Sequence, residues 1–440
     1  MAWTLITSIG TSGYTEVEYN FKEGLCRTPY PAVALCKITE KPPERVLVFI
    51  TEKANAANGD KYRVALKEAA GVEPEILVIP EGKNETELVK ILGQVIDAME
   101  AAPDGMDMAL DVTFSFRSLQ FIFFAAAFYL TSQKRLRLKG IYYGAYELDK
   151  PRAALIDLSR LIRIIDWYYA VRGFRETGSL AGLSRTLGRI AADFAKAGGD
   201  LGAVSAIRKS VDALVFPLEN AMVLEAGILA KSRSANLDRL SQPNIMETLP
   251  ELRPIIKDLA DIFSWLGVPE SGPKTKTSIP LEEGELDREL RFMEFYLDHS
   301  RVQECSLLMR EWLINLVLWV KQEEQWLDHE IRHQESELPL GYWCRLLTSK
   351  NGPGAVQLSQ FQIELAKIFT RVGEIRNHFA HLAFGEKNFS DPIQKLREIF
   401  DQLKTIKVQA KGMRPEQLDQ PRPLQGQRND PPDNLAQPED

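Results

Sequence analysis

Val46-Leu47-Val48-Phe49-Ile50 is a run in which every residue is apolar. A strand that is apolar throughout, rather than at alternate positions, is typical of a parallel sheet covered on both faces. Similar short runs occupy residues 3–9, 75–79, 106–113 and 139–146, and amphipathic helical patterns separate most of them, at 61–70, 85–101 and 118–132. Strands that alternate with helices predict an α/β domain with a Rossmann-like, doubly wound parallel sheet over residues 1–158.

The second part of the chain, residues 159–410, has no strand signal. Its apolar residues recur with a 3.6-residue period, which predicts an all-α domain. The expected helices span 158–174, 180–197, 203–229, 253–266, 286–326 with a break near Asp298, 357–383 and 392–406. Residues 267–284, rich in Pro, Gly, Lys and Thr, are predicted to form a loop or insertion. The tail, 411–440, is rich in Pro, Gln and Asp and is predicted to be disordered.

Composition narrows the class of protein. The chain has 440 residues, 45% of them hydrophobic and 26% charged, as in a soluble protein of two or more domains. A net charge of -7 argues against non-specific binding of duplex DNA. The four cysteines are far apart and suit reduced thiols, and the start lacks a basic signal-peptide region. The longest apolar runs fall short of the ~20 residues that span a membrane, so a cytoplasmic location without membrane attachment is expected.

Polar and glycine-rich segments follow three of the expected strands. They are 8–14, 51–54 and 111–118, and the carboxyl ends of parallel strands are where α/β proteins bind ligands. Glycines let a ligand approach the backbone, while hydroxyls and a helix start can bind an anion. The simpler interpretation is a set of turn and N-cap residues. The candidate ligand-binding residues are Gly10, Thr11, Ser12, Gly13, Tyr14, Thr51, Thr113, Ser115, Phe116, Arg117 and Ser118.

A second candidate site is the segment Ile375-Arg376-Asn377-His378-Phe379-Ala380-His381. Arginine is a permanent cation that can hold a phosphate, and histidine can transfer a proton near neutral pH. Cleavage of an RNA phosphodiester without a metal requires both functions. The candidate catalytic residues are Arg376, Asn377 and His381. Arg371 with His378 forms an alternative pair, and histidines placed on a helix by chance are the simplest interpretation.

A rival motif, His329-Glu330-Ile331-Arg332-His333, has the H-E-x-x-H spacing of zinc metalloproteases. Its neighbours are strongly polar, and Arg332 stands where such helices usually have an uncharged residue. A solvated, charged helix end is the favoured interpretation, so no metal is expected.

Taken together, the motifs resemble a known family. Residues 10–14, 51–54, 111–118 and 140–145 are similar, in order and spacing, to the CARF sensor domain of CRISPR-associated ribonucleases of type III systems, and Arg376–His381 resembles the signature of their HEPN nuclease domain. The resemblance covers residues 1 to about 405. It implies a homodimer, or a higher oligomer, that binds a cyclic oligoadenylate, the tetra-adenylate being the family's commoner activator. Binding would switch on metal-independent cleavage of single-stranded RNA to 2′,3′-cyclic phosphates in antiviral defence, with no cofactor.

The resemblance also assigns roles to residues. Arg376 would stabilise charge on the scissile phosphate, His381 would move a proton, and Asn377 would orient one of them. Arg117 and backbone N–H groups would contact phosphates of the activator, and Tyr14 or Phe116 would stack on adenine. The alternative is a cyclic-nucleotide sensor without catalysis that acts through a protein partner.

Overall fold

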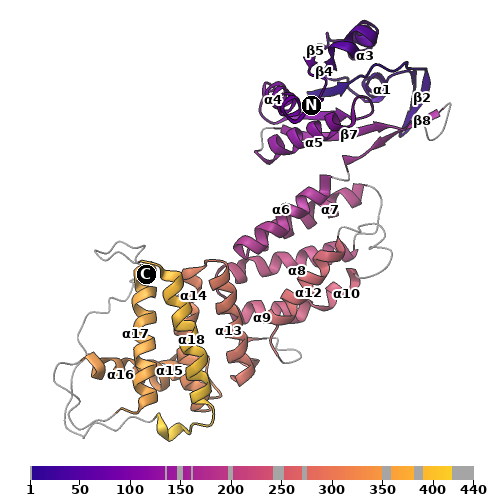
Figure 1. Cartoon of the computed structure of the whole chain (residues 1–440). Helices are drawn as coiled ribbons and strands as arrows, with labels where there is room; N and C mark the ends of the chain where they lie inside the picture. Colours follow the sequence, from indigo (N-terminus) through magenta and orange to yellow (C-terminus); the bar gives the residue numbers. More distant parts are fainter. Residues whose placement is uncertain are drawn as a thin grey trace, which may run out of the picture. The chain divides into compact units, whose positions relative to one another are not determined.

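The computed structural model describes residues 2–133, 136–145, 152–159, 162–196, 202–240, 252–269, 275–348, 358–380 and 390–418. They form two compact units, Met1–Ile165 and Asp166–Asp440, which are described separately below (Figure 1). The first unit is an α/β sheet domain and the second is helical, which confirms the predicted fold class.

The first unit is built on an eight-stranded sheet with the order β3-β2-β8-β7-β6-β1-β4-β5. Five of these strands pair in parallel, as predicted for a doubly wound sheet. They are β1 (Trp3–Ser8), β4 (Arg45–Thr51), β5 (Glu75–Ile79), β6 (Met106–Asp111) and β7 (Leu136–Gly144). From β1 the chain proceeds to β4 and β5 on one side and to β6 and β7 on the other.

Strand β4 shows why the sheet is covered on both faces. Val46, Val48 and Ile50 pack in one apolar core, and Leu47 and Phe49 pack in another. Helices α1 (Pro31–Ile38) and α3 (Asp60–Ala70) contribute to the first core, and α4 (Glu85–Glu100) and α5 (Arg117–Ser132) to the second (Figure 1). The unbroken apolar run therefore serves two cores at once.

Three strands were not predicted: β2 (Val17–Phe21), β3 (Gly24–Thr28) and β8 (Arg152–Asp157). Strand β8 is antiparallel to β7 and parallel to β2, and β3 closes the edge as an antiparallel partner of β2. These strands are short, and exposed or half-exposed positions recur along them because one face of this part of the sheet is less covered. The hydrophobic pattern of these strands in the sequence is weaker than that of the central strands.

The helical unit forms one continuous apolar core. Its helices are α6 (Ile162–Thr177), α7 (Ala181–Lys196), α8 (Gly202–Glu219), α9 (Val223–Arg233), α10 (Ala235–Leu240), α12 (Leu252–Leu266), α13 (Glu283–Asp298), α14 (Val302–Val320), α15 (His329–Arg332), α16 (Leu338–Thr348), α17 (Gln360–Ala380) and α18 (Pro392–Ala410). The predicted break near Asp298 is present, and Ser300 there has a positive φ of 57°.

Two sequence predictions need correction in this unit. The helix predicted over 203–229 is two helices, α8 and α9, separated at Ala221, which has a positive φ of 53°. The packed chain also continues past Lys411, where the tail was predicted to begin. A short 3-10 turn spans Pro415–Gln417, and Leu418 is buried in the helical core. Residues 419–440 lie outside the described residues.

A buried polar network crosses α13, α14 and α15. Arg288 donates to both carboxylate oxygens of Glu285 and to the carbonyls of Val223 and Leu266. Asn315 donates to Glu289 and accepts from Arg332, with N–O distances of 2.9 and 2.8 Å. Burial, with the nearby Glu285 carboxylate, raises the pKa of Glu289 to about 8.

Glu289→Gln is expected to flatten the pH dependence of stability. With its pKa raised from 4.5 to about 8, native Glu289 keeps a proton that the unfolded chain has lost. Its stabilising contribution is full below about pH 4.5 and is lost as the pH rises to about 8. Urea unfolding from pH 5 to 8.5 checks this, with exposed Glu294→Gln on α13 as the control. Equal slopes for the wild type and Glu289→Gln would refute the assignment.

Candidate functional site

A pocket lies at the carboxyl ends of β1, β4, β5 and β6. The chain leaves β1 toward opposite sides of the sheet, so the boundary between β1 and β6 is its topological switch point. In open α/β sheets this is where ligands bind. The cavity has a volume of about 560 Å³, within the range of small-molecule sites.

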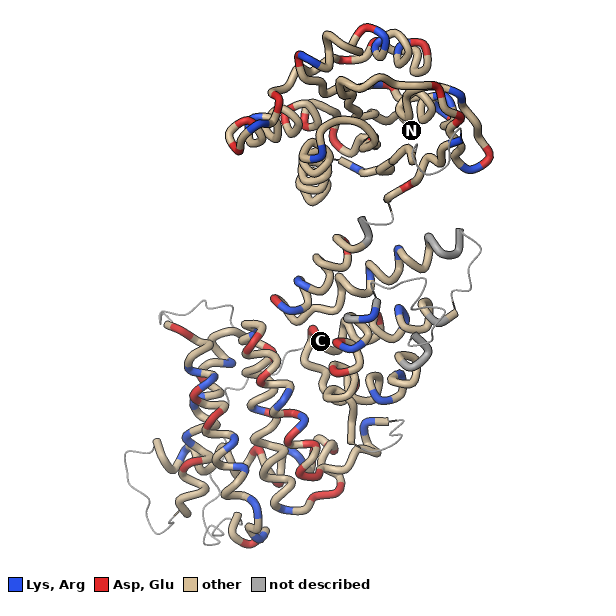
Figure 2. The backbone as a smooth tube through the Cα atoms, turned by 45° about the vertical axis from the view of Figure 1, so that its right-hand side comes forward, with Lys and Arg blue, Asp and Glu red and all other residues tan. Residues whose placement is uncertain are grey.

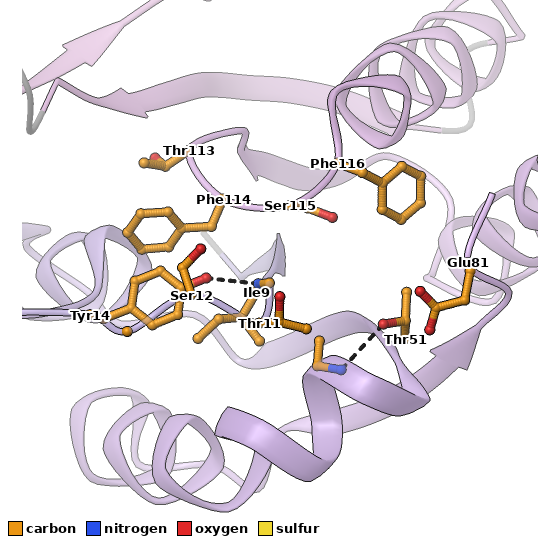
Figure 3. A pocket seen from close by; sticks show the side chains of 13 residues that line it. Ile9, Thr11, Ser12, Tyr14, Thr51, Glu81, Thr113, Phe114, Ser115 and Phe116 are labelled. Atoms are coloured by element: carbon orange, nitrogen blue, oxygen red, sulfur yellow. Dashed lines mark hydrogen bonds between the residues drawn. The ribbon is translucent and has the colours of Figure 1, made fainter. Parts of the chain in front are cut away.

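The structure brings the predicted ligand residues together, with two exceptions. The pocket is lined by Ile9, Gly10, Thr11, Ser12, Gly13, Tyr14, Thr51, Ala54, Glu81, Thr113, Phe114, Ser115 and Phe116 (Figure 3). Arg117 and Ser118 are absent from this lining and begin α5 at its edge. Ile9, Ala54, Phe114 and Glu81 line it without having been predicted.

The loop after β1 is fixed from two directions. Asn58, in the π-helical turn Asn55–Gly59, donates its amide to the carbonyls of Gly10 and Ser12 at 2.9 and 3.1 Å. The hydroxyl of Tyr14 accepts from the N–H of Gly10 at 2.9 Å. The side chains of Asn58 and Tyr14 therefore hold the backbone of this loop in place before a ligand enters.

A buried carboxylate supports the floor of the pocket. Asp111, at the end of β6, accepts from the hydroxyls of Thr7 (2.8 Å) and Thr113 (2.6 Å) and from the N–H of Thr113 (3.1 Å). Thr113 in turn accepts from the N–H of Gly144, and Thr7 shares a hydrogen bond with Tyr62 on α3. Complete burial raises the pKa of Asp111, although these hydrogen bonds oppose the shift. The network joins β1, β6, β7 and α3 behind Thr113.

The loop between β6 and α5 carries backbone strain. Ser115 has a φ of 119°, a region that favours glycine, and the hydroxyl of Ser8 holds the preceding carbonyl of Phe114 at 2.6 Å. Phe116 is the N-cap residue of α5 and supplies no side-chain acceptor to the first N–H groups of that helix. Strained residues cluster at functional sites, and free N–H groups at a helix start can bind an anion.

Aromatic rings flank the pocket at two places. Tyr14 packs against Phe114, with ring centroids 4.5 Å apart, and also contacts Tyr30. Burial raises the pKa of Tyr14, so its hydroxyl stays neutral near pH 7. Phe116 lies apart from this pair (Figure 3). The pocket therefore offers separate aromatic surfaces rather than one platform.

Charge is sparse in the pocket. Among the described residues that line it, Glu81 is the one charged residue, and the other polar groups are hydroxyls and backbone amides. Elsewhere in the described chain, basic and acidic residues are interspersed (Figure 2). Binding of an anionic ligand would therefore depend on neutral hydrogen-bond donors and on the N–H groups at the start of α5.

The helical unit places Arg376 and Asn377 in the last turns of α17. Arg376 is half-buried, and its Nη1 donates to the Asn377 side-chain oxygen at 3.3 Å. Its Nε is buried without a hydrogen-bond partner, and no carboxylate pairs with Arg376 within the described part of the chain. An incompletely satisfied guanidinium is suited to donate hydrogen bonds to a phosphate oxygen.

The alternative arginine is already engaged. Arg371 donates to Gln402 and Glu398 on α18, at 3.0 and 3.3 Å. His378 packs edge-on against Phe379 and is half-buried. His381 lies outside the described residues.

The H-E-x-x-H segment has a structural explanation. Arg332 donates to Asn315, to the carbonyl of Trp326 and to Glu311, which ties α15 to α14. His329 and Glu330 are exposed, and a π-helical turn begins at His333. Over the described residues, no group of three or more side chains could hold a metal ion. The zinc alternative is left without a third ligand there.

Comparison with known proteins gives a partial match. No protein-family model matches the chain. It is 26% identical over 130 residues to the CRISPR-associated protein MJ1674 of Methanocaldococcus jannaschii, which covers 29% of this chain and 20% of that relative. The match thus spans about a fifth of the relative's length. It confirms, for that part of the chain, the resemblance to a CRISPR-associated protein.

A solved structure shows a weaker likeness. Enterococcus italicus Csm6, bound to cyclic hexa-2′-fluoro-hexa-dAMP, aligns over 93% of this chain and 94% of its own with 12% identity and a TM-score of 0.37. Among the described helices, none has the length and apolar character needed to cross a membrane.

Proposed function

We propose that this chain is a ribonuclease of CRISPR antiviral defence that a cyclic oligoadenylate activates. Residues 1–158 would form the sensor and residues 159–410 the nuclease. The observation that carries the proposal is the occurrence, in one chain, of a neutral-donor pocket at a sheet switch point and of an Arg376 guanidinium on α17 that has no carboxylate partner among the described residues. The partial match to a CRISPR-associated relative supports it.

The pocket would bind the cyclic oligoadenylate through the phosphates and bases of that ring. Hydroxyls of Thr11, Ser12 and Ser115 and the N–H groups that begin α5 would contact phosphate oxygens, and Arg117 would approach from the edge. A cyclic tetra-adenylate has rotational symmetry, so a two-fold dimer could present the same loops to both halves. We propose a homodimer for this reason.

The nuclease reaction needs no metal in this proposal. His381 takes the proton of the ribose 2′-hydroxyl, whose oxygen attacks the phosphorus. The bond to the 5′-oxygen breaks, and that oxygen takes up a proton, leaving a 2′,3′-cyclic phosphate and a 5′-hydroxyl. Arg376 stabilises the charge that develops on the phosphate oxygens, and Asn377 holds the guanidinium through their 3.3 Å contact. We propose that two copies of the chain together complete one site, each contributing the Arg376 that lies on its α17.

Cleavage of a fluorescent single-stranded RNA in EDTA tests the function. Cyclic tetra- or hexa-adenylate is expected to raise the rate of wild-type cleavage, and His381→Ala is expected to abolish the response because the proton transfer is lost. Silence with both rings, or unchanged activity in His381→Ala, would overturn the nuclease proposal. Tight ring binding without cleavage would instead identify a sensor that acts through a partner.

A further inference from the structure

Glu81 and Phe116 share one end of the pocket. In Figure 3 both lie on the right of the pocket, opposite the end formed by Tyr14, Phe114 and Thr113. Glu81 follows β5 and Phe116 follows β6, so two different strand ends supply this corner. From this juxtaposition we propose that the corner is an adenine-reading subsite, in which Phe116 stacks on the base and Glu81 accepts from its 6-amino group. The inference rests on the function proposed above and specifies how the sensor selects its base.

Gly82, the residue after Glu81, lies against the aromatic ring of Phe116. It has a φ of 70°, and a Cβ built there would lie 3.0 Å from Cε2 of Phe116 and 3.3 Å from Leu88. The ring therefore rests against the backbone of the residue that directly follows Glu81. Phe116 is only partly buried against the core, which leaves surface for a stacked base. Such stacking contributes about 1–3 kcal/mol per base in single-stranded nucleic acids.

The charge of Glu81 determines what it can contact. It is the one charged residue that the described part of the chain contributes to the lining, and a carboxylate repels phosphate. An ionised carboxylate is also an acceptor only, so its partner must be a donor. Adenine carries a donor, the 6-amino group, where guanine carries an oxygen. Glu81 has no hydrogen-bond or ion-pair partner among the described residues, so its acceptor capacity is unused.

The positions of Glu81 and Phe116 predict which base the pocket prefers, and they do not predict how tightly a ring binds. Removing the carboxylate also removes a repulsion toward phosphate, which would tighten binding of any ring. The informative quantity is therefore the ratio of affinities for two rings that share the same phosphates. A hydrogen bond to a charged acceptor corresponds to a ratio of at least about tenfold.

The test measures dissociation constants for two cyclic tetranucleotides, one built from adenosine and one from purine riboside. The second lacks the 6-amino group but retains the stacking ring and every phosphate. Wild type is expected to prefer the adenosine ring by at least about tenfold. Glu81→Gln and Glu81→Ala are expected to reduce that preference several-fold. The control is Glu85→Gln, which removes an exposed carboxylate in the first turn of α4.

Each outcome has a distinct meaning. A preference that falls in both Glu81 variants and persists in Glu85→Gln supports the subsite. Equal affinities in the wild type, or a preference unchanged by Glu81→Ala, overturn the subsite but leave ring binding intact. If neither ring binds the wild type, and cyclic hexanucleotides of both kinds also fail, the proposed ligand class is wrong and the subsite falls with it.

Discussion

Arg376→Ala is expected to lower activator-dependent RNA cleavage by about 10²–10³-fold, the usual effect of removing a donor that stabilises transition-state charge. The side chain has an unsatisfied Nε and no carboxylate partner in the described chain, so it contributes little to folding that its loss would disturb. Activator binding, which depends on the other unit, should be unchanged. Single-turnover cleavage of a fluorescent RNA, together with thermal unfolding and ring affinity, measures all three quantities.

Two further variants sharpen this test. Lys367→Ala removes an exposed cation from the same helix and should retain wild-type cleavage. Arg371→Ala should lower stability modestly, because it breaks the contacts with Gln402 and Glu398, and should leave cleavage within a few-fold of wild type. A loss at Arg371 as large as that at Arg376 would show that the alternative pair, Arg371 and His378, is catalytic.

Arg288→Met is expected to destabilise the helical unit by about 3–5 kcal/mol, the cost of leaving a buried carboxylate without its partner. The side chains of Arg288 and Glu285 are 3% and 1% exposed. Arg288 also satisfies the carbonyls of Val223 and Leu266, at 3.0 Å each, and so ties α9 and α12 to α13. Urea unfolding followed by circular dichroism measures the change.

Arg291→Met is the matched control, since Arg291 is exposed on the same helix. It should change the free energy of unfolding by less than about 0.5 kcal/mol. The double variant Glu285→Leu, Arg288→Met should recover much of the lost stability, because no uncompensated charge stays buried. A loss below about 1 kcal/mol in Arg288→Met would show that the pair is not isolated from water.

Much of the pocket was predictable because its residues follow strands. Segments 8–14, 51–54 and 111–118 each come directly after a strong apolar run, and parallel strands end at a common edge. Glu81 was not predictable by this route. One glutamate two residues beyond a strand has no distinctive pattern, and the proximity of the next residue, Gly82, to Phe116 is a tertiary contact between distant segments.

The helical site was predictable only in part. The arginine–asparagine pair is a local feature of one helix, and the structure places both side chains as neighbours. The engagement of Arg371 depends on α18, which is distant in sequence. The role of Arg332 was likewise hidden, because its partners Asn315 and Glu311 lie on another helix.

The pocket wall, among the described residues, contains neither lysine nor arginine. With Arg117 at the edge as the one proposed cationic contact, binding there would depend less on ionic strength than in most receptors for nucleic acids. A sensor of this construction would keep the same threshold for its signal when the salt around it rises or falls.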